Sequence, residues 1–501
     1  MEPTPAFIEK HELWSDDQVR LSAQIQRRVE VENLKLIRLA WSDTHGASRA
    51  KAVSVSAFFD ALRHGYNINV ATFTLDAAGG RVFASFTKGG GMELDQMTGS
   101  PNLTIVPDPA TFRILPWAPD IGWILCDEYF DDGRRFYFSS RQLLRRQLER
   151  LEEKGKSLIV GLEVEWYLAR LEDGIIGNEN IGEPGTRGQA IKTLPLEPGY
   201  SYHSETNLDV MQPVLSKLAE TYEKLDLPLR SMENEWGPGQ VECTFSPSEA
   251  MRAADDYFLF RTATRQVCRR LGHFATFMCR PALKGYYSSG WHLHQSIIEK
   301  VSGQNLFMPD KSDLHLSSFG SSFLAGLLNN AIPSAIFSVP TINGYRRFQP
   351  NSLAPNRATW GFDHRGAMIR VLGGVSDPST RIENRIGEPA ANPYLYIASQ
   401  IVAGLEGVES NLTPWQPDDE PYTAERSLLP GSLGQALSAL QNDTLYSRHF
   451  GELFCDYFIK LKQAEIERFG EKHGEFKHGE FDATETGVVT EWEQNEYFDF
   501  F

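Results

Sequence analysis

The stretch from Leu158 to Leu168 alternates apolar side chains with a second set, a pattern typical of a β-strand with one buried face. Successive side chains on a strand point to opposite faces, so Glu163 and Glu165 share the face opposite the apolar one. His292 and His294 have the same spacing in a second apolar segment. If both segments are strands, two carboxylates and two imidazoles can project into one space. This spacing predicts divalent-metal and phosphate chemistry.

Further acids and arginines suit the same chemistry. Carboxylates stand on both sides of a Gly-Pro-Gly turn at 237–239, and arginines gather in short segments between 346 and 385. Acids and imidazoles hold divalent cations, while the guanidinium fork clamps phosphates and carboxylates. Taken singly, each motif has a plainer explanation as a solvated strand face or loop. The residues concerned are Glu233, Glu235, Glu242, Arg346, Arg347, Arg357, Arg365, Arg370, Arg381, Glu383 and Arg385.

Composition limits the class of protein. A chain of 501 residues exceeds the usual size of one hydrophobic core, which predicts two domains. The net charge of −17 argues against a nucleic-acid partner, because phosphate binding needs an excess of Lys and Arg. The five cysteines form no CxxC pair, the N-terminus lacks a signal-peptide pattern, and no apolar run is long enough for a membrane span. We expect a reduced, cytoplasmic protein without a membrane partner.

Local patterns predict how the chain is organised. We expect a strand-rich N-terminal part up to about residue 135 and a loop insert from Glu172 to Pro198. The tail at 489–498 combines aromatic and acidic residues, and it could dock on a neighbouring subunit or cap its own domain. Helices are expected at about 15–31, 55–64, 140–154, 207–225, 247–272, 317–332, 392–408 and 446–470.

The motifs occur in a recognisable order. GxExEW is followed by ENEWGPGQVE, SSGWHLHQS, NGYRRFQP, APNRATWGFDHRGAMIRV and RIENRIGEPAANPYLY. This order resembles that of the glutamine synthetase family, over about residues 139–501. The resemblance implies an α+β fold, with a small β-grasp-like domain at 1–135 and a catalytic domain at 136–501 whose curved antiparallel sheet is surrounded by helices. It also implies a homo-oligomer, a dodecamer of two stacked hexameric rings, with each site between neighbouring subunits.

The resemblance assigns a role to most of the charged residues. It implies ATP, two or three Mg²⁺ or Mn²⁺ ions per site, and L-glutamate as the acid substrate. One metal would be held by Glu165, Glu235 and Glu242, and another by Glu163, His292 and Glu383. The nucleotide would lie against His294, Arg365, Arg370 and Arg381, with Arg365 also acting in phosphoryl transfer. Glutamate would be bound by Arg347 and Arg385 beside Tyr287 and Gly290, and Arg347 would also contact the phosphate.

The family reaction has two steps. The γ-carboxylate of glutamate attacks ATP to give γ-glutamyl phosphate, and an amine then displaces phosphate to give an amide. Carboxylates are poor electrophiles, so phosphorylation supplies a leaving group, and cations neutralise the charge of the transferred group.

Two departures from the family pattern concern the amine. When Pro107-Asp108 is aligned with the family's Pro-Asp pair, Asn102 takes the position of an ammonium-binding aspartate, and Leu353 replaces the flap glutamate. A buried cation needs a compensating charge, so this pair suits an amine that arrives neutral, such as an arylamine.

The segment before His292 also departs from the family. The family's Asn-Gly-Ser-Gly becomes Tyr287-Ser288-Ser289-Gly290, so the asparagine that helps to hold the glutamate amino group is absent. Tyr286, Tyr287 or Trp291 could line an apolar amine pocket, although aromatic core packing is the better explanation of such residues.

We therefore predict a ligase that makes a γ-glutamylamide from an aromatic or hydrophobic amine. A γ-glutamylpolyamine synthetase is the close alternative, since Glu93, Asp95 or Asp108 could supply the missing negative charge. An ammonia-using synthetase and a phosphotransferase that stops after the first step are further alternatives. A non-enzymatic ring protein is disfavoured, because all six metal positions are Glu or His.

Overall fold

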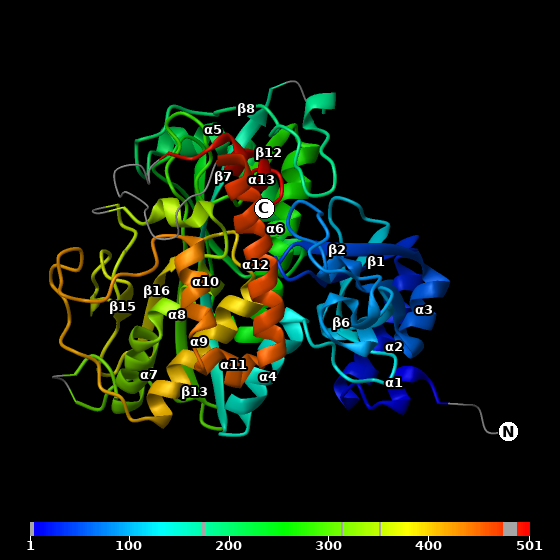
Figure 1. Cartoon of the computed structure of the whole chain (residues 1–501), viewed down its shortest axis with the longest axis horizontal. Coiled ribbons are helices and arrows are strands. Elements are labelled where there is room, and N and C mark those ends of the chain that lie inside the picture. Colours follow the sequence, from blue (N-terminus) through cyan, green and yellow to red (C-terminus); the bar gives the residue numbers. More distant parts are fainter. Residues whose placement is uncertain (1–4, 173–175, 312–313, 350–351, 474–487) are drawn as a thin grey trace.

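The computed structural model describes residues 5–172, 176–311, 314–349, 352–473 and 488–501, which form a mixed α+β fold with two sheets. The N-terminal elements, in blue, gather on one side of the molecule (Figure 1). Within the described residues they form a six-stranded sheet whose main path is β2-β1-β6-β4-β3, with β5 paired to β6. Its strands are β1 (Leu36–Ser42), β2 (Ser48–Ser54), β3 (Tyr66–Asn69), β4 (Asn102–Pro107), β5 (Arg113–Ile114) and β6 (Ile121–Tyr129).

The second sheet has ten strands in the described part of the chain and curls around the centre of the larger lobe. Its path is β14-β15-β16-β13-β7-β10-β9, and β8, β11 and β12 pair with β7. Apart from β14 and β15, neighbouring strands are antiparallel. The strands are β7 (Lys156–Leu171), β8 (Thr193–Leu194), β9 (Leu229–Asn234), β10 (Gln240–Phe245), β11 (Ser248–Glu249), β12 (His273–Thr276), β13 (Trp291–Glu299), β14 (Trp360–Phe362), β15 (Ile369–Leu372) and β16 (Arg381–Gly387).

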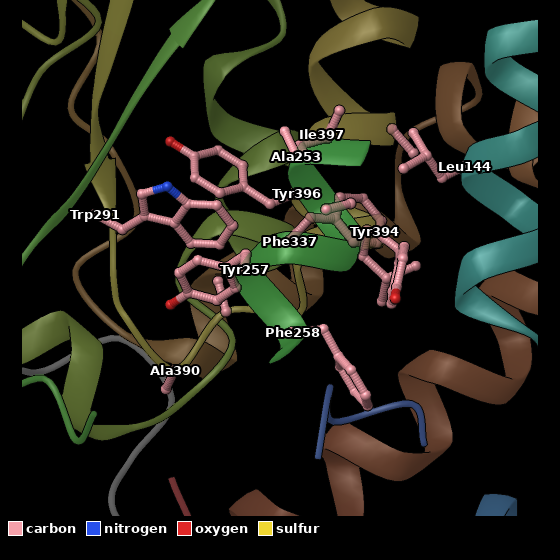
Figure 2. Packing of buried hydrophobic residues seen from close by; sticks show 14 of the residues in the cluster. Leu144, Ala253, Tyr257, Phe258, Trp291, Phe337, Ala390, Tyr394, Tyr396 and Ile397 are labelled. Carbon is pink, nitrogen blue, oxygen red and sulfur yellow. The ribbon is translucent and has the colours of Figure 1, made fainter. Parts of the chain in front are cut away.

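Helices cover this sheet and bury its apolar face. Trp291 of β13 stacks on Tyr257 of α6, with ring centroids 4.0 Å apart, and meets the edge of Tyr396 of α9 (Figure 2). The main helices are α2 (Asp16–Val31), α3 (Val55–His64), α4 (Ser140–Glu152), α5 (Glu205–Lys224), α6 (Ala250–Arg270), α7 (Ser318–Asn329), α8 (Ala331–Ser338), α9 (Pro393–Glu409), α10 (Leu433–Gln441), α11 (Leu445–Phe450), α12 (Glu452–His473) and α13 (Glu491–Tyr497). None of the helices in the described part is both long and apolar enough to cross a membrane.

Most of the predicted elements are confirmed, with two differences. The strand predicted at 158–168 is β7, and its residues Leu158, Val160, Leu162, Val164, Trp166 and Leu168 are all buried. The helix expected at 317–332 instead gives way to α8 after Asn329, and Pro333, which cannot donate a helical hydrogen bond, lies in the first turn of α8. The helix expected at 446–470 is interrupted at Gly451, whose φ of 96° is incompatible with an α-helix.

The predicted insert and tail also have local structure. Between 176 and 198 lie a short turn of helix and β8, whereas residues 173–175 are outside the described part. The tail forms α13, and its Glu493 pairs with the buried Arg346 at 3.1 Å while Phe498 stacks on Phe274. The tail therefore caps its own chain.

Candidate active site

Four adjacent strands bring the predicted acids and imidazoles together. In the order β10-β7-β13-β16, the register places Glu242 opposite Glu165, His292 opposite Glu163, and His294 opposite Glu383. Directly opposed residues on neighbouring strands project from the same face of the sheet. We call these six residues, together with Glu235 in the turn after β9, the acidic cluster.

Glu163 is the central member of the acidic cluster. One carboxylate oxygen lies 2.6 Å from Nδ1 of His292, and the other lies 3.0 Å from Nε2 of His294. Ligand atoms of Glu163, His294 and Glu383 lie within 4.8 Å of one another, as do those of Glu163, Glu242 and His292. The second group combines members of both predicted ligand sets, and the first places His294 beside Glu163 and Glu383.

The electrostatics of the cluster favour a cation. Burial raises the pKa values of Glu165, Glu235 and Glu242, and neighbouring carboxylates raise them further. Burial also acts on Glu163 and Glu383, but their pKa values are lowered, because His292 faces the first and Arg385 the second. Carboxylate oxygens and imidazole nitrogens are donors for Mg²⁺ and Mn²⁺. The residues present therefore fit a divalent metal site.

Gly290 allows an arginine to reach the cluster. A Cβ atom on this residue would lie 2.4 Å from Nη2 of Arg347, so a larger residue would displace the guanidinium. The backbone N–H of Gly290 donates to Glu165 at 3.1 Å, and Gln240 donates to the same carboxylate oxygen at 2.9 Å. Glu165 is thus held in one orientation by two neutral donors.

The predicted arginines surround the other side of the cluster. Arg347 is buried, donates to the carbonyl of Arg385 at 2.8 Å, and places Nη2 3.4 Å from His292. Arg385 and Arg370 both bind the carboxylate of Glu383, the latter at 3.1 Å.

The two remaining arginines lie at the edge of this group. Arg381 donates to Nδ1 of His294 at 3.2 Å. Arg365 is exposed, and its carbonyl accepts a hydrogen bond from Arg385 at 3.1 Å. The predicted nucleotide-binding and glutamate-binding arginines are therefore gathered around one cluster.

Of the three aromatic residues near His292, Tyr287 is the one that is half-buried rather than buried. Trp291 and Tyr286 are buried in packing, as Figure 2 shows for Trp291. The hydroxyl of Tyr287 donates to the carbonyl of Ser352 at 3.1 Å and so ties the segment before β13 to the loop that follows Arg347. In that loop Leu353 is 45% exposed and has a φ of 60°. Residues 350 and 351 of the same loop lie outside the described residues.

Asn102 lies in the other sheet. It begins β4, pairs with Asn69 of β3, and is exposed. The ten-stranded sheet, which carries the acidic cluster, is a separate body of strands. A contribution of Asn102 to catalysis stays a prediction.

Sequence reasoning missed an aromatic platform beside the cluster. Tyr202 stacks on Trp236 with ring centroids 5.2 Å apart and planes 10° apart. The two side chains are 48% and 38% exposed, and the backbone N–H of Tyr200 anchors the segment by donating to the carbonyl of Trp236 at 2.6 Å. Burial and then Glu235 and Glu242 raise the pKa of Tyr202 to about 12. The signal available in the sequence was Trp236 itself, directly after a predicted metal ligand.

The chain is similar to known proteins over most of its length. The family model described as glutamine synthetase, catalytic domain, matches residues 138–481. The gamma-glutamylanilide synthase of Acinetobacter sp is 41% identical over 497 residues, which are 98% of each chain. The glutamate–isopropylamine ligase of Pseudomonas sp is 28% identical and covers 91% of this chain and 96% of its own. The solved GmaS/ADP complex superposes with a TM-score of 0.74 at 26% identity, covering 89% of this chain and 96% of its own.

Proposed function

The chain belongs to the glutamine synthetase family, and we propose that it is an ATP-dependent ligase joining the γ-carboxylate of L-glutamate to an aromatic amine. The observation that carries this proposal is its similarity, over almost the whole chain, to a gamma-glutamylanilide synthase. The acidic cluster supports it, because the residues gathered there are those that nucleotide-dependent acyl activation requires.

The proposed reaction has two balanced steps. A γ-carboxylate oxygen of glutamate attacks the γ-phosphorus of ATP, which breaks the bond to ADP and gives γ-glutamyl phosphate. The amine nitrogen then attacks the acyl carbon, phosphate leaves, and the nitrogen loses one proton. The products are a γ-glutamylamide, ADP and phosphate.

Different side chains of the site would serve substrate binding and charge neutralisation in this reaction. Arg347 and Arg385 would grip the glutamate α-carboxylate and the phosphate that leaves, since both side chains are buried and Arg347 donates to the backbone carbonyl of Arg385. Arg365 and Arg370 would neutralise charge on the transferred phosphoryl group, and His294 and Arg381 would face the nucleotide.

For the metal ligands we propose the two sets that the sequence predicts. Glu165, Glu235 and Glu242 would hold one Mg²⁺ or Mn²⁺, and Glu163, His292 and Glu383 another, with two or three ions per site. When bound, these ions supply positive charge for the ATP phosphates.

Two features favour an aromatic amine over ammonia. Leu353 offers no charge to ammonium, and the platform of Tyr202 and Trp236 offers an exposed aromatic surface next to Glu235. Stacking of a substrate ring there would contribute about 0.5–1.5 kcal/mol beyond its buried area. Aniline is neutral at pH 7, so it requires neither of the absent acids.

The polyamine alternative has lost one of its supports. Asp108 is buried and bound by Arg141 at 2.7 Å, so its charge is already compensated. Glu93 and Asp95 are exposed and would have to supply the negative charge by themselves.

The proposal extends to the assembly. Residues 1–135 would form a β-grasp-like domain and 136–501 the catalytic domain, arranged in the cytoplasm as a dodecamer of two stacked hexameric rings. The position of Asn102 in the separate six-stranded sheet suits such an arrangement, in which the small domain of one subunit completes the site of the next.

An amine panel tests the proposed function. Phosphate release and amide mass would be measured with glutamate, Mg-ATP and either aniline, isopropylamine, putrescine or ammonia. We expect aniline to be used with the highest kcat/KM. Trp236→Leu should raise the KM for aniline about 2–10-fold, the loss of a stacking contact, with less effect for isopropylamine. Tyr202→Phe keeps the ring and serves as the matched control. Ammonia used as well as aniline by the unmodified protein would overturn the neutral-amine argument.

A further inference from the structure

A basic groove lies apart from the acidic cluster, where α6, β12 and the start of β2 meet the C-terminal residues 499–501. In Figure 1 the C-terminus is marked beside α6. The cavity volume is about 490 Å³, within the range of roughly 300–1,000 Å³ typical of small-molecule sites. No residue that lines the groove belongs to the acidic cluster.

The groove concentrates positive charge in an acidic protein. Among the described residues that line it are five arginines and a histidine, against one carboxylate side chain, Asp499. The whole chain has a net charge of −17, so this local excess of positive charge is opposite in sign to the charge of the protein. The cationic residues are Arg49, Arg261, Arg265, Arg269, Arg270 and His273.

Three of these arginines have internal partners. Arg49 binds the carboxylate of Asp43 at 2.8 Å. Arg261 donates to backbone carbonyls that include those of Pro389 and Gly46. Arg265 donates to the carbonyl of Phe500 at 2.8 Å and lies 3.7 Å from Asp499. These arginines build the walls of the groove and fix the C-terminal segment against α6.

Arg269 and Arg270 differ from these three arginines in their hydrogen bonds and ion pairs. Within the described part of the chain, Nη1 of Arg269 is buried and has no hydrogen-bond partner, and neither residue has a carboxylate within ion-pair distance. Arg270 is exposed and donates only to the carbonyl of Gln266 at 3.3 Å, which belongs to the same helix. A buried guanidinium nitrogen without a hydrogen-bond partner is costly, and the Arg269 guanidinium has only the ring of Phe274 opposite it among the described residues, 6.0 Å from Cζ to the ring centroid.

Neighbouring positive charges lower the pKa values of arginines in and beside the groove. Burial lowers the pKa of Arg265 to about 10, and although Asp499 opposes this shift, Arg261, Arg187 and Arg269 lower it further. Arg270 adds to the effect of burial in lowering the pKa of Arg38. Arg269 and Arg270 lie in the last turn of α6, where arginines complement the helix dipole, but Arg261 and Arg265 extend the positive charge one and more turns before that end.

We propose that this groove is a second ligand site, which binds a small anion carrying two or more phosphate or carboxylate charges. The guanidinium groups of Arg269 and Arg270 provide the planar donor pairs that such oxyanions accept. Phe274 and Phe500 line the same groove and offer an apolar wall to the carbon body of a ligand. The site is separate from catalysis and goes beyond the proposed ligase activity.

Calorimetric titration of the full chain, dialysed free of divalent metal and of chelator, tests the proposal. Pyrophosphate and citrate are the probes, and chloride is the monovalent control. We expect one of the two probes to bind stoichiometrically, which identifies phosphate or carboxylate as the preferred group. The double variant Arg269→Glu, Arg270→Glu should weaken that binding at least tenfold, whereas Arg27→Glu, an exposed arginine on α2, should leave it unchanged. Equal affinity in the double variant and the unmodified protein would overturn the proposal, as would binding no stronger than that of chloride.

Two further variants separate the groove from the active site. Arg347→Ala removes a buried arginine of the active site and should leave groove binding unchanged; loss of binding there would assign the probe to the active site instead. Arg270→Gln changes an exposed residue that is not expected to disturb folding. It should weaken binding several-fold while the amide-forming rate at saturating substrates stays within twofold. A large loss of that rate would place the groove within the substrate machinery and contradict a separate site.

Discussion

Arg141, on the first turn of α4, joins the two sheets through three buried carboxylates. Its guanidinium lies 2.7 Å from Asp108, 2.8 Å from Asp127 and 2.7 Å from Asp255. Asp108 and Asp127 belong to the N-terminal lobe, whereas Asp255 lies on α6. Replacing Arg141 with Met removes the only side chain that contacts all three acids within the described residues.

The loss of stability expected for Arg141→Met can be estimated from the pKa of Asp108. Burial alone would raise the pKa of Asp108, but Arg141 and Arg145 lower it to about 2 from an ordinary value of 3.8. A shift of this size corresponds to about 2 kcal/mol of stability. Removing one partner from a buried ion pair costs about 3–5 kcal/mol, because the other charges remain buried. We therefore expect Arg141→Met to lower the free energy of unfolding by about 3–5 kcal/mol at pH 7.

The sign of the pH dependence follows from the same shift. The folded-state pKa of Asp108 is depressed, so its contribution is present above about pH 4 and is lost as the pH falls through 2. The difference between the unmodified protein and Arg141→Met should therefore narrow as the medium is acidified from pH 4 toward pH 2.

Thermal and urea unfolding at several pH values would measure this difference. An unfolding entropy of about 2 cal/mol/K per residue converts the loss into a Tm lower by roughly 3–5 °C for a chain of this length. Arg134→Met is the matched control, because Arg134 pairs with Asp132 on the surface and should leave stability unchanged. A variant at Arg141 as stable as the unmodified protein at pH 7 would refute the idea that this ion network holds the lobes together.

Three other predictions concern the site and the core. Glu165→Ala or His292→Ala should reduce ATP turnover on the order of 100-fold or more while the circular dichroism spectrum is unchanged, and normal turnover would refute their assignment as metal ligands. Leu353→Glu should improve the use of ammonia relative to aniline several-fold in competition assays, since it restores a negative charge to the flap; an unchanged ratio would contradict its role. Burial raises the pKa of Glu128 to about 8, although Ser139 donates to it, so stability should fall between about pH 4.5 and 8. Glu128→Gln should flatten that part of the pH profile in urea unfolding, and an unaltered slope would show that another group is responsible.

Local sequence patterns predicted the parts of the site that depend on strand periodicity. Glu163 and Glu165 were expected on one face because side chains alternate along a strand, and β7 confirms that face. The helix starting near Ser139 was predicted by its capping residue, whose hydroxyl accepts the backbone N–H of Gln142 at 3.2 Å. Such features rest on contacts within a few residues, so a single chain segment contains all the information.

The pairing of those segments required the tertiary structure. Strands β7 and β16, which both pair with β13, are separated by more than 200 positions in the chain. Their registers with β13 place Glu163 opposite His292 and Glu383 opposite His294. The environment of Trp291 also required the tertiary structure. The sequence allowed it a place in an amine pocket, whereas the structure packs it against Tyr257. Whether an aromatic side chain faces a ligand or a core depends on which helix covers its strand.

The sequence by itself determined which chemical groups the chain carries, their spacing on each strand, and the order of motifs that resembles the glutamine synthetase family. The stacking of Tyr202 on Trp236, and the burial of Nη1 of Arg269 without a hydrogen-bond partner in the described part of the chain, came from the tertiary fold alone. The physical reason is that periodicity and capping act over a few residues, whereas burial, ion pairing and stacking depend on distances between segments that the order of residues does not specify.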